Sequence, residues 1–418
     1  MPLRRPLTFA KVLAFTTRWL LLCAAVAIVA GSASALFLFA LDWATRTRTL
    51  QPGLIWGLPL AGFAMGWIYL KWGKSVDAGH NLLIDEINAP IQTVPLRMAP
   101  MILGSTVISH LFGASVGREG TAVQMGGSLA DQLTSIFKLS PTYRQVVLMA
   151  GISAGFASVF GTPLAGALFA LEVLAGPALL RMRWIALPPC IVAAFAADQV
   201  GLWWGVQHTV YTVSAIPTLT AWGLASVVLA GGVFGLTGRV FAWSAHTLSA
   251  QFKQWVAYPP LRPLIGGVLI TAFVVWGHAE RYIGLGIPVI LEAFDQPLAP
   301  WDFAAKLAMT VLSLGSGFKG GEVTPLFYIG ATLGNALAPI VDMPLGLMAA
   351  LGFVAVFAGA SNTPLACTLM AIELFGFQTG AFAAVACTVS YFFSGHTSIY
   401  KAQRHAKKPW LAPRERRP

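Results

Sequence analysis

Two short glycine-flanked stretches carry the acidic residues best suited to chemistry in this chain. Residues 117–121 are Gly-Arg-Glu-Gly-Thr and residues 320–324 are Gly-Gly-Glu-Val-Thr, so Glu119 and Glu322 each stand beside a glycine within apolar sequence. A carboxylate inside an apolar segment is costly and usually has a function. The two glutamates are therefore candidates for ion binding or proton transfer. The structural alternatives are an ion pair of Glu119 with Arg118, and a helix cap formed by Glu322.

These stretches belong to an internal repeat, which predicts how they are positioned. Residues 162–172 match residues 363–373 at seven of eleven positions, and each copy has one of the glutamate stretches upstream. If each half crosses the bilayer an odd number of times, the halves are inverted and their broken helices point at a common centre. Helix N-termini have unpaired N–H groups and a partial positive charge, so such a centre binds an anion. Glu172 and Glu373 end the repeated segments, where we expect capping or interfacial pairing.

The composition indicates that lipid surrounds the elements carrying this centre. The 418 residues are 56% hydrophobic and 10% charged, and residues 19–41, 145–171 and 343–372 contain no charged residue. Because about 20 apolar residues cross a bilayer, we expect one all-α membrane domain, with repeats at approximately 12–200 and 215–400 and no C-terminal regulatory domain. The apolar run after Arg18 is expected to be a retained first helix. The 42 glycines and 26 prolines predict broken and re-entrant helices.

The net charge of +11 does not indicate nucleic-acid binding, because nine of the eleven excess charges lie in residues 1–11 and 401–418. Basic ends are typical of cytoplasmic termini, so both termini are expected in the cytoplasm of a multi-pass cell-membrane protein. The four cysteines lack metal or disulfide spacing, and His-Glu-x-x-His is absent. We therefore expect no metal, no cofactor and no enzymatic activity.

The first glutamate stretch resembles a known family. Gly-Arg-Glu-Gly followed by three residues and Gln124 is similar to the signature of the CLC family of anion channels and proton-coupled anion exchangers. The second stretch and the late Tyr400 resemble the same family, over about residues 60–405. The resemblance implies a homodimer of inverted-repeat subunits, each with its own pathway, and implies that Glu119 is the gating glutamate. It also places a set of backbone positions along the pathway: Gly117, Arg118, Gly120 and Val323.

Three departures from the chloride-type pattern resemble the fluoride-exporting branch. Thr121 stands where chloride-type members have proline, the second stretch carries Glu322 and Thr324, and residues 77–82 are Asp-Ala-Gly-His-Asn-Leu instead of Gly-Ser-Gly-Ile-Pro. Fluoride holds its water tightly, so its site needs strong donors such as hydroxyls and backbone amides. Thr121, Thr324 and Tyr400 are the expected hydroxyl residues of the site.

Three polar residues in this pattern keep open alternatives. His80 departs from the fluoride branch, and is either a donor to the anion or a structural histidine, with Asn81 as a neighbouring donor. Glu322 is expected to be protonated, to hydrogen-bond Thr324, or to pass protons, unless it caps its own helix.

The chemistry of Glu119 predicts coupled transport. Deprotonated, its carboxylate occupies the anion site, and protonated it leaves that site. We therefore expect a fluoride/proton antiporter that exports fluoride from the cytoplasm. Val173 stands where chloride exchangers have an internal proton-transfer glutamate, which argues against their proton path. The alternatives are a chloride/proton exchanger or a passive halide channel of the same fold, and an intramembrane enzyme.

Overall fold

The computed structural model describes residues 9–174 and 180–403, and its elements in these ranges are helices. The first half of the chain forms α1 (Phe9–Leu50), α2 (Leu58–Ile68), α3 (His80–Asn88), α4 (Met98–Phe112), α5 (Glu119–Ile136), α6 (Pro141–Phe160), α7 (Pro163–Glu172) and α8 (Leu180–Trp203). The second half forms α9 (Ala221–Trp255), α10 (Leu261–Gly277), α11 (Ile287–Asp295), α12 (Asp302–Ser316), α13 (Val323–Val341), α14 (Leu345–Ser361), α15 (Pro364–Phe375) and α16 (Gly380–Phe393). Single turns include η1 (Pro52–Gly57) and η2 (Tyr69–Gly73). The basic terminal stretches lie mostly outside the described residues.

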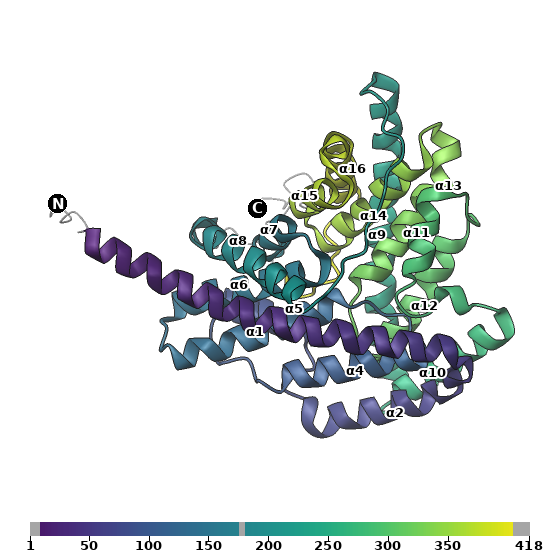
Figure 1. Cartoon of the computed structure of the whole chain (residues 1–418). Coiled ribbons are helices and arrows are strands. Elements are labelled where there is room, and N and C mark those ends of the chain that lie inside the picture. The colour runs from purple at the N-terminus through teal and green to yellow at the C-terminus, as the bar shows by residue number, and fades with distance from the viewer. Residues whose placement is uncertain (1–8, 175–179, 404–418) are drawn as a thin grey trace, which may run out of the picture.

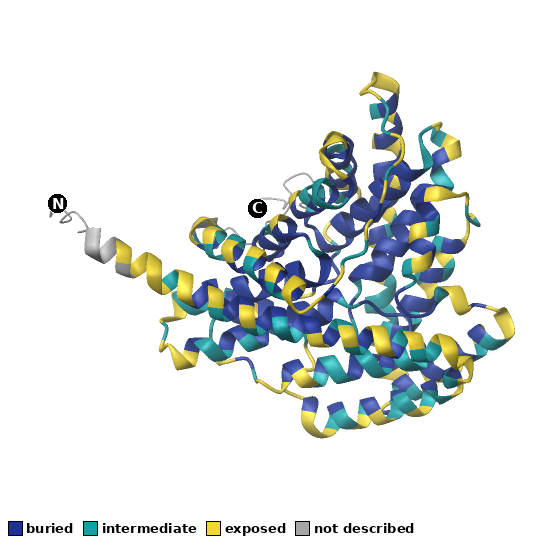
Figure 2. Ribbon diagram, viewed as in Figure 1, coloured by how far each residue is buried: buried dark blue, intermediate teal, exposed yellow. Residues whose placement is uncertain are grey.

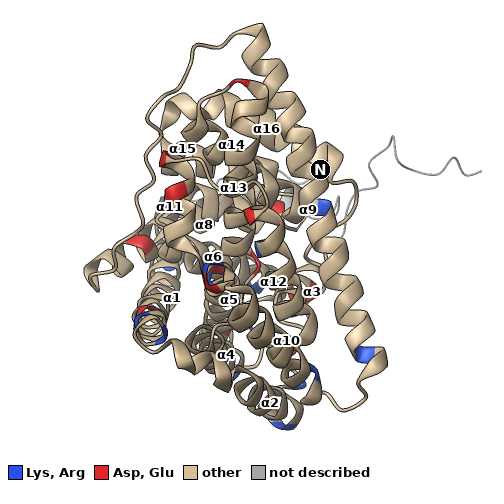
Figure 3. Ribbon diagram, turned by 90° about the vertical axis from the view of Figure 1, so that its right-hand side faces the viewer, with Lys and Arg blue, Asp and Glu red and all other residues tan. Residues whose placement is uncertain are grey.

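Several helices have the length and composition of membrane spans. Six qualify among the described residues: Phe15–Leu50, Pro52–Gly73, Pro141–Phe160, Trp184–Trp203, Ala221–Trp255 and Val323–Val341. The described residues also form shorter apolar helices of 10–17 residues. Charged side chains are sparse along the bundle, as Figure 3 shows. The protein is therefore an integral membrane helix bundle, and the apolar run after Arg18 is confirmed as part of its first helix.

Two pairs of helices at corresponding places in the two halves have equal lengths. α3 and α11 have nine residues each, and α4 and α12 have 15 residues each. Both α4 and α12 end at a glycine with positive φ, Gly113 at 94° and Gly317 at 108°. Side chains are strained in this backbone region, so glycine ends each helix in the same way. The broken helices expected from the glycine and proline content are thereby confirmed.

The buried centre of the bundle is built on α6 and α14 (Figures 1 and 2). α6 packs between α5 and α8, and α14 packs on α13 and α16, while the long α1 lies across α4, α5 and α8. Nearly every residue of α14 is buried. A Cβ at Gly330 of α13 would overlap the backbone of Gly352 in α14, so this pair needs glycine on both helices for its close approach.

The ends of the repeated segments cap each other. Glu373 accepts hydrogen bonds from the backbone N–H groups of Leu164 and Ala165, at 2.8 and 2.9 Å, at the start of α7. Glu172 accepts equivalent bonds from Leu365 and Ala366, at 3.0 and 2.8 Å, at the start of α15. Each half therefore supplies the carboxylate for a helix N-terminus of the other half, as expected for a capping role.

Replacing one of these caps is expected to destabilise the fold. Glu373→Gln should lower the free energy of unfolding by about 1–2 kcal/mol, because a neutral amide is a weaker partner for a helix N-terminus than a carboxylate. Thermal unfolding of the purified protein in detergent measures this change. Glu292→Gln, which alters a half-exposed carboxylate paired with Arg281 at 3.5 Å, is the matched control. Equal melting temperatures for the two variants would contradict the capping role.

Candidate anion-transport site

Two helix N-termini meet at the centre of the fold. The segments before α5 and α13 form an antiparallel bridge, in which the N–H of Gly117 donates to the carbonyl of Gly321 at 2.6 Å and the reciprocal bond is 2.8 Å. A Cβ at Gly321 would lie 2.7 Å from the backbone nitrogen of Gly120, so only glycine permits this approach. The starts of α5 and α13, related by the repeat, are thereby joined directly.

Glu119 lies between these helix starts and is fully buried. Its Oε2 accepts hydrogen bonds from the backbone N–H of Thr324 at 3.0 Å and from the hydroxyl of Thr324 at 2.5 Å. Its Oε1 accepts a bond from Nε of Arg118 at 3.2 Å. The same carboxylate therefore pairs with Arg118 and accepts hydrogen bonds at the start of α13. The arrangement satisfies an orphan N–H of α13 with negative charge.

A cavity of 170 Å³ lies on one side of this centre, and we call it the inner cavity. His80, Asn81, Gln124, Glu322 and Tyr400 are among the residues that line it. The rings of His80 and Tyr400 are 5.2 Å apart, and Nδ1 of His80 contacts the Gln124 amide nitrogen at 3.2 Å. Nε2 of His80 is buried with no hydrogen-bond partner. Because the amide nitrogen of Gln124 can only donate, Nδ1 of His80 accepts this bond and Nε2 carries the proton of the neutral ring.

Glu322 faces the inner cavity and does not make the two bonds considered for it. It is the N-cap residue of α13, but its side chain makes no capping hydrogen bond, so the cap expected as an alternative is wrong. The hydroxyl of Thr324 donates to Glu119, and no hydrogen bond between Thr324 and Glu322 is found among the described residues. Oε2 of Glu322 is buried without a partner. This oxygen can therefore form a hydrogen bond with an ion or molecule that enters the inner cavity.

Asn81, Thr121 and Val323, which were also predicted for the site, do not all lie at the inner cavity. Oδ1 of Asn81 accepts the N–H of Ala402 at 2.8 Å, which ties the chain after Tyr400 to the start of α3. The hydroxyl of Thr121 is buried on that of Thr106 at 2.7 Å, and Thr121 does not line the inner cavity. Val323 is buried in the first turn of α13. Thr121 thus lies next to the start of α5, but its hydroxyl bonds to Thr106 between packed helices and not to the inner cavity.

A second cavity, of 390 Å³, lies beside Arg118, and we call it the outer cavity. Arg118 lines it together with Asp42 and Arg46 of α1 and with Thr209. Glu119 bonds to Arg118, which lines this cavity, and to Thr324, two residues after Glu322, which lines the inner cavity. Its carboxylate therefore bonds to a residue of the outer-cavity lining and to Thr324, and lines neither cavity itself.

Two polar features of the fold had no place in the sequence predictions. Lys306 in α12 is fully buried, and its ammonium donates to the carbonyls of Tyr282 at 3.0 Å and Gly284 at 2.7 Å. Lys306 thereby supplies hydrogen bonds to backbone carbonyls of the irregular segment before α11. Its sequence signal is a lysine within an otherwise apolar helix, because a charged residue there usually has a specific role. Thr106, the partner of Thr121, has no comparable signal, because threonine is common in apolar helices.

Two Gly-x-Ser-x-Gly stretches, a spacing typical of serine hydrolases, are accounted for by packing. Ser153 lies inside α6 and donates to the carbonyl of Met149 at 3.0 Å. Ser115 precedes α5, and its hydroxyl contacts that of Thr310 at 2.9 Å. Neither serine stands at a turn from a strand into a helix, which that spacing requires in a hydrolase. Among the described residues, no group of three or more His, Cys, Asp or Glu is placed to hold a metal ion.

The all-helical fold agrees with the comparison with known families. The family model described as "Voltage gated chloride channel" matches residues 61–395. The chain belongs to this family. Its members transport ions, and the resemblance seen in the glutamate stretches is confirmed.

Similar proteins extend over nearly the whole chain. A "Chloride/fluoride channel protein" of Pseudomonas syringae pv. tomato is 60% identical over 96% of this chain and 90% of its own length. The solved structure of a CLC-type fluoride/proton antiporter has a TM-score of 0.90 and 35% identity, covering 96% of this chain and 100% of that chain. A slow cyanobacterial Cl⁻/H⁺ antiporter has a TM-score of 0.79 at 21% identity, covering 92% of this chain and 96% of that chain, and supports the fold alone.

Proposed function

We propose that the protein is a fluoride/proton antiporter that exports fluoride from the cytoplasm in exchange for protons. The observation that carries this proposal is the position of Glu119, whose carboxylate takes both the N–H and the hydroxyl of Thr324 at the start of α13. A carboxylate that fills an anion position is exchangeable for an anionic substrate. The protonation of Glu119 then decides which of the two occupies the site.

The transport cycle follows from the two states of this carboxyl group. Ionised, Glu119 closes the passage between the inner and outer cavities by occupying the donors of Thr324. Protonated, it carries no charge, loses most of its attraction to the start of α13, and releases these donors to fluoride. Each time fluoride replaces the Glu119 carboxylate in the site, Glu119 has taken up one proton, so fluoride movement is coupled to proton movement. Glu322, with a free oxygen at the inner cavity, is placed to exchange protons with that cavity.

Fluoride is favoured over chloride as the substrate by the donors at the site. Removing the water of a small anion is compensated only by strong, close donors, such as the hydroxyl and amide of Thr324. The free Nε2 of His80 and the ring of Tyr400 add polar groups in the inner cavity. The names of the similar proteins, one a chloride/fluoride channel protein and one a fluoride/proton antiporter, support fluoride as well.

Transport by the purified protein in liposomes tests the proposal. A fluoride electrode should record release of fluoride in preference to chloride, with simultaneous uptake of protons by the liposomes. A proton gradient alone should drive fluoride uphill. Uphill movement excludes a passive channel, which the name of the Pseudomonas relative favours, and equal chloride flux would contradict the fluoride selectivity.

The placement in the membrane is part of the same proposal. We infer a cell-membrane protein with both termini in the cytoplasm, built from inverted repeats at about residues 12–200 and 215–400 and without enzymatic activity. The matched helix order and the reciprocal caps of α7 and α15 support the repeat.

We also infer a homodimer with one pathway in each subunit, as the family resemblance implies. Counting subunits by single-molecule photobleaching in liposomes tests the dimer.

His80 is expected to contribute a donor to the fluoride pathway. His80→Phe keeps a ring against Tyr400 but removes Nε2, and should reduce fluoride efflux about two- to tenfold, because a neutral hydrogen bond is worth about 0.5–1.5 kcal/mol. The initial rate of efflux measured with a fluoride electrode gives the change. An unchanged rate in a well-folded variant would assign His80 a structural role.

A further inference from the structure

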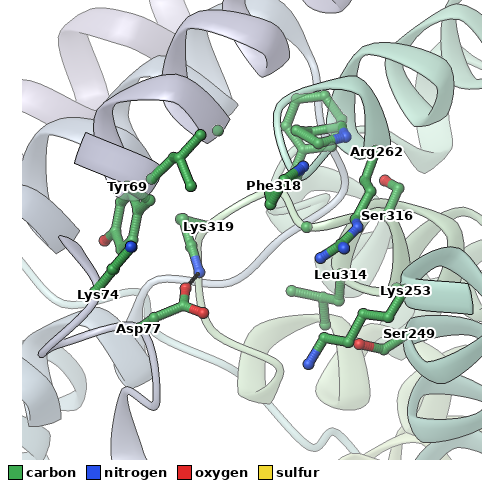
Figure 4. A pocket seen from close by; sticks show the side chains of 16 residues that line it. Tyr69, Lys74, Asp77, Ser249, Lys253, Arg262, Leu314, Ser316, Phe318 and Lys319 are labelled. Atoms are coloured by element: carbon green, nitrogen blue, oxygen red, sulfur yellow. Dashed lines mark hydrogen bonds and ion pairs between the residues drawn. The ribbon is translucent and has the colours of Figure 1, made fainter. Parts of the chain in front are cut away.

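A third cavity, of 440 Å³, adjoins the inner cavity, and we call it the basic vestibule (Figure 4). Four cationic side chains line it: Lys74 after η2, Lys253 of α9, Arg262 of α10 and Lys319 before α13. Asp77 is the one acidic residue of its lining. A cavity lined mainly by one sign of charge concentrates ions of the opposite sign, so this cavity collects anions.

Lys319 and Asp77 mark the place where the vestibule meets the inner cavity. Both residues line both cavities, as do Tyr69 and Phe318. The ammonium of Lys319 and Oδ1 of Asp77 are 2.6 Å apart, as the dashed line in Figure 4 marks. An anion that moves from the vestibule to the inner cavity therefore passes this ion pair.

The two residues of the pair differ in their exposure and in their other contacts. The side chain of Lys319 is 22% exposed, and its ammonium lies 4.3 Å from the centre of the Tyr69 ring. Its backbone carbonyl accepts the hydroxyl of Ser109 at 2.8 Å. The side chain of Asp77 is 59% exposed, on the turn before α3. The Asp77 carboxylate is therefore the more exposed partner, and the Lys319 ammonium is the more enclosed one.

The pair is ionised but weakly held. Lys319 lowers the pKa of the Asp77 carboxyl through charge attraction, so this carboxyl remains an anion at neutral pH. Half-exposed ion pairs contribute little to stability, because water screens them. A small anion that reaches Lys319 can form the same charge-assisted hydrogen bond that Asp77 forms.

We propose that the Lys319 ammonium is a transient binding site for a small inorganic anion at the neck between the basic vestibule and the inner cavity, and that Asp77 is its tethered competitor. The anion enters when Asp77 rotates away, and Asp77 returns when the anion moves on toward Glu119. The proposal rests on the transport function proposed above, with fluoride as the anion. At the neck, the anion replaces the carboxylate of Asp77, just as fluoride is proposed to replace the carboxylate of Glu119 at the centre.

The test compares fluoride entry from the two faces of the membrane. Initial fluoride uptake is measured in everted and right-side-out membrane vesicles at a series of fluoride concentrations. Asp77→Asn, which removes the competitor, should lower the KM for fluoride about two- to fivefold on one face only. Lys319→Met should raise the KM on that same face about tenfold or more, because a charge-assisted donor is lost. In the double variant, Asp77→Asn should have no further effect.

The controls separate this proposal from general charge effects. Lys71→Met alters an exposed lysine next to the vestibule that does not line it, and Asp85→Asn alters an exposed carboxylate on α3. Both should leave the KM unchanged on both faces. Equal shifts on the two faces, shifts of the same sign for Asp77→Asn and Lys319→Met, or no shift for Asp77→Asn would overturn the proposal. Absence of fluoride flux in the wild-type protein would instead contradict the proposed function.

Discussion

Glu119→Gln is expected to abolish proton-driven fluoride transport. Glutamine has nearly the same shape, and its amide oxygen can still accept the N–H of Thr324, which Glu119 accepts at 3.0 Å. It carries no charge and does not titrate, so it cannot compete with fluoride as an anion or carry a proton. We therefore expect fluoride accumulation driven by a proton gradient to fall to the level of empty liposomes.

The measurement combines a fluoride electrode with a pH electrode on the same liposomes. Residual fluoride flux without proton movement is consistent with the gate, because a neutral side chain leaves the passage uncoupled. Glu292→Gln changes a half-exposed carboxylate that lines neither cavity and should retain coupling. Undiminished proton-coupled exchange by Glu119→Gln would show that this carboxylate is not the gate.

Local sequence signals were sufficient to predict the centre of the fold. The glycine-flanked glutamate stretches indicated broken helices that point at a common centre, and the structure joins Gly117 to Gly321 there. The repeat indicated two related helix starts, which is where the buried carboxylate lies. These predictions succeeded because each depends on a residue type whose physical role is almost independent of distant neighbours.

Pairings between distant residues could not be predicted in the same way. Lys319 and Asp77 are 242 positions apart, and the distance between them depends on how α3 and α13 pack. Thr121 stood beside Glu119 in the sequence and was expected at the anion site, yet its helix turns its hydroxyl toward Thr106. The direction of a side chain on a helix depends on its neighbours in space, which one sequence does not report.

Thr324→Val is expected to weaken fluoride transport about tenfold or more, because a hydrogen bond to a charged group is worth about 1.5–3 kcal/mol. Valine has the size and branching of threonine, so the first turn of α13 should keep its packing. The variant loses the hydroxyl that donates to Glu119 at 2.5 Å and that we assign to fluoride when Glu119 leaves. The backbone N–H of residue 324 remains as a donor.

The loss should fall more heavily on fluoride than on chloride, because the smaller anion depends more on a close donor to replace its water. Fluoride and chloride efflux from matched liposomes gives the selectivity ratio before and after the change. Thr332→Val is a closely matched control, since Thr332 is buried two turns further along α13 and donates to the carbonyl of Tyr328 in its own helix, at 2.8 Å. If the two valine variants transport both halides equally well, the hydroxyl of Thr324 has no part in selectivity, and the backbone amides at the start of α13 must bind the anion without it.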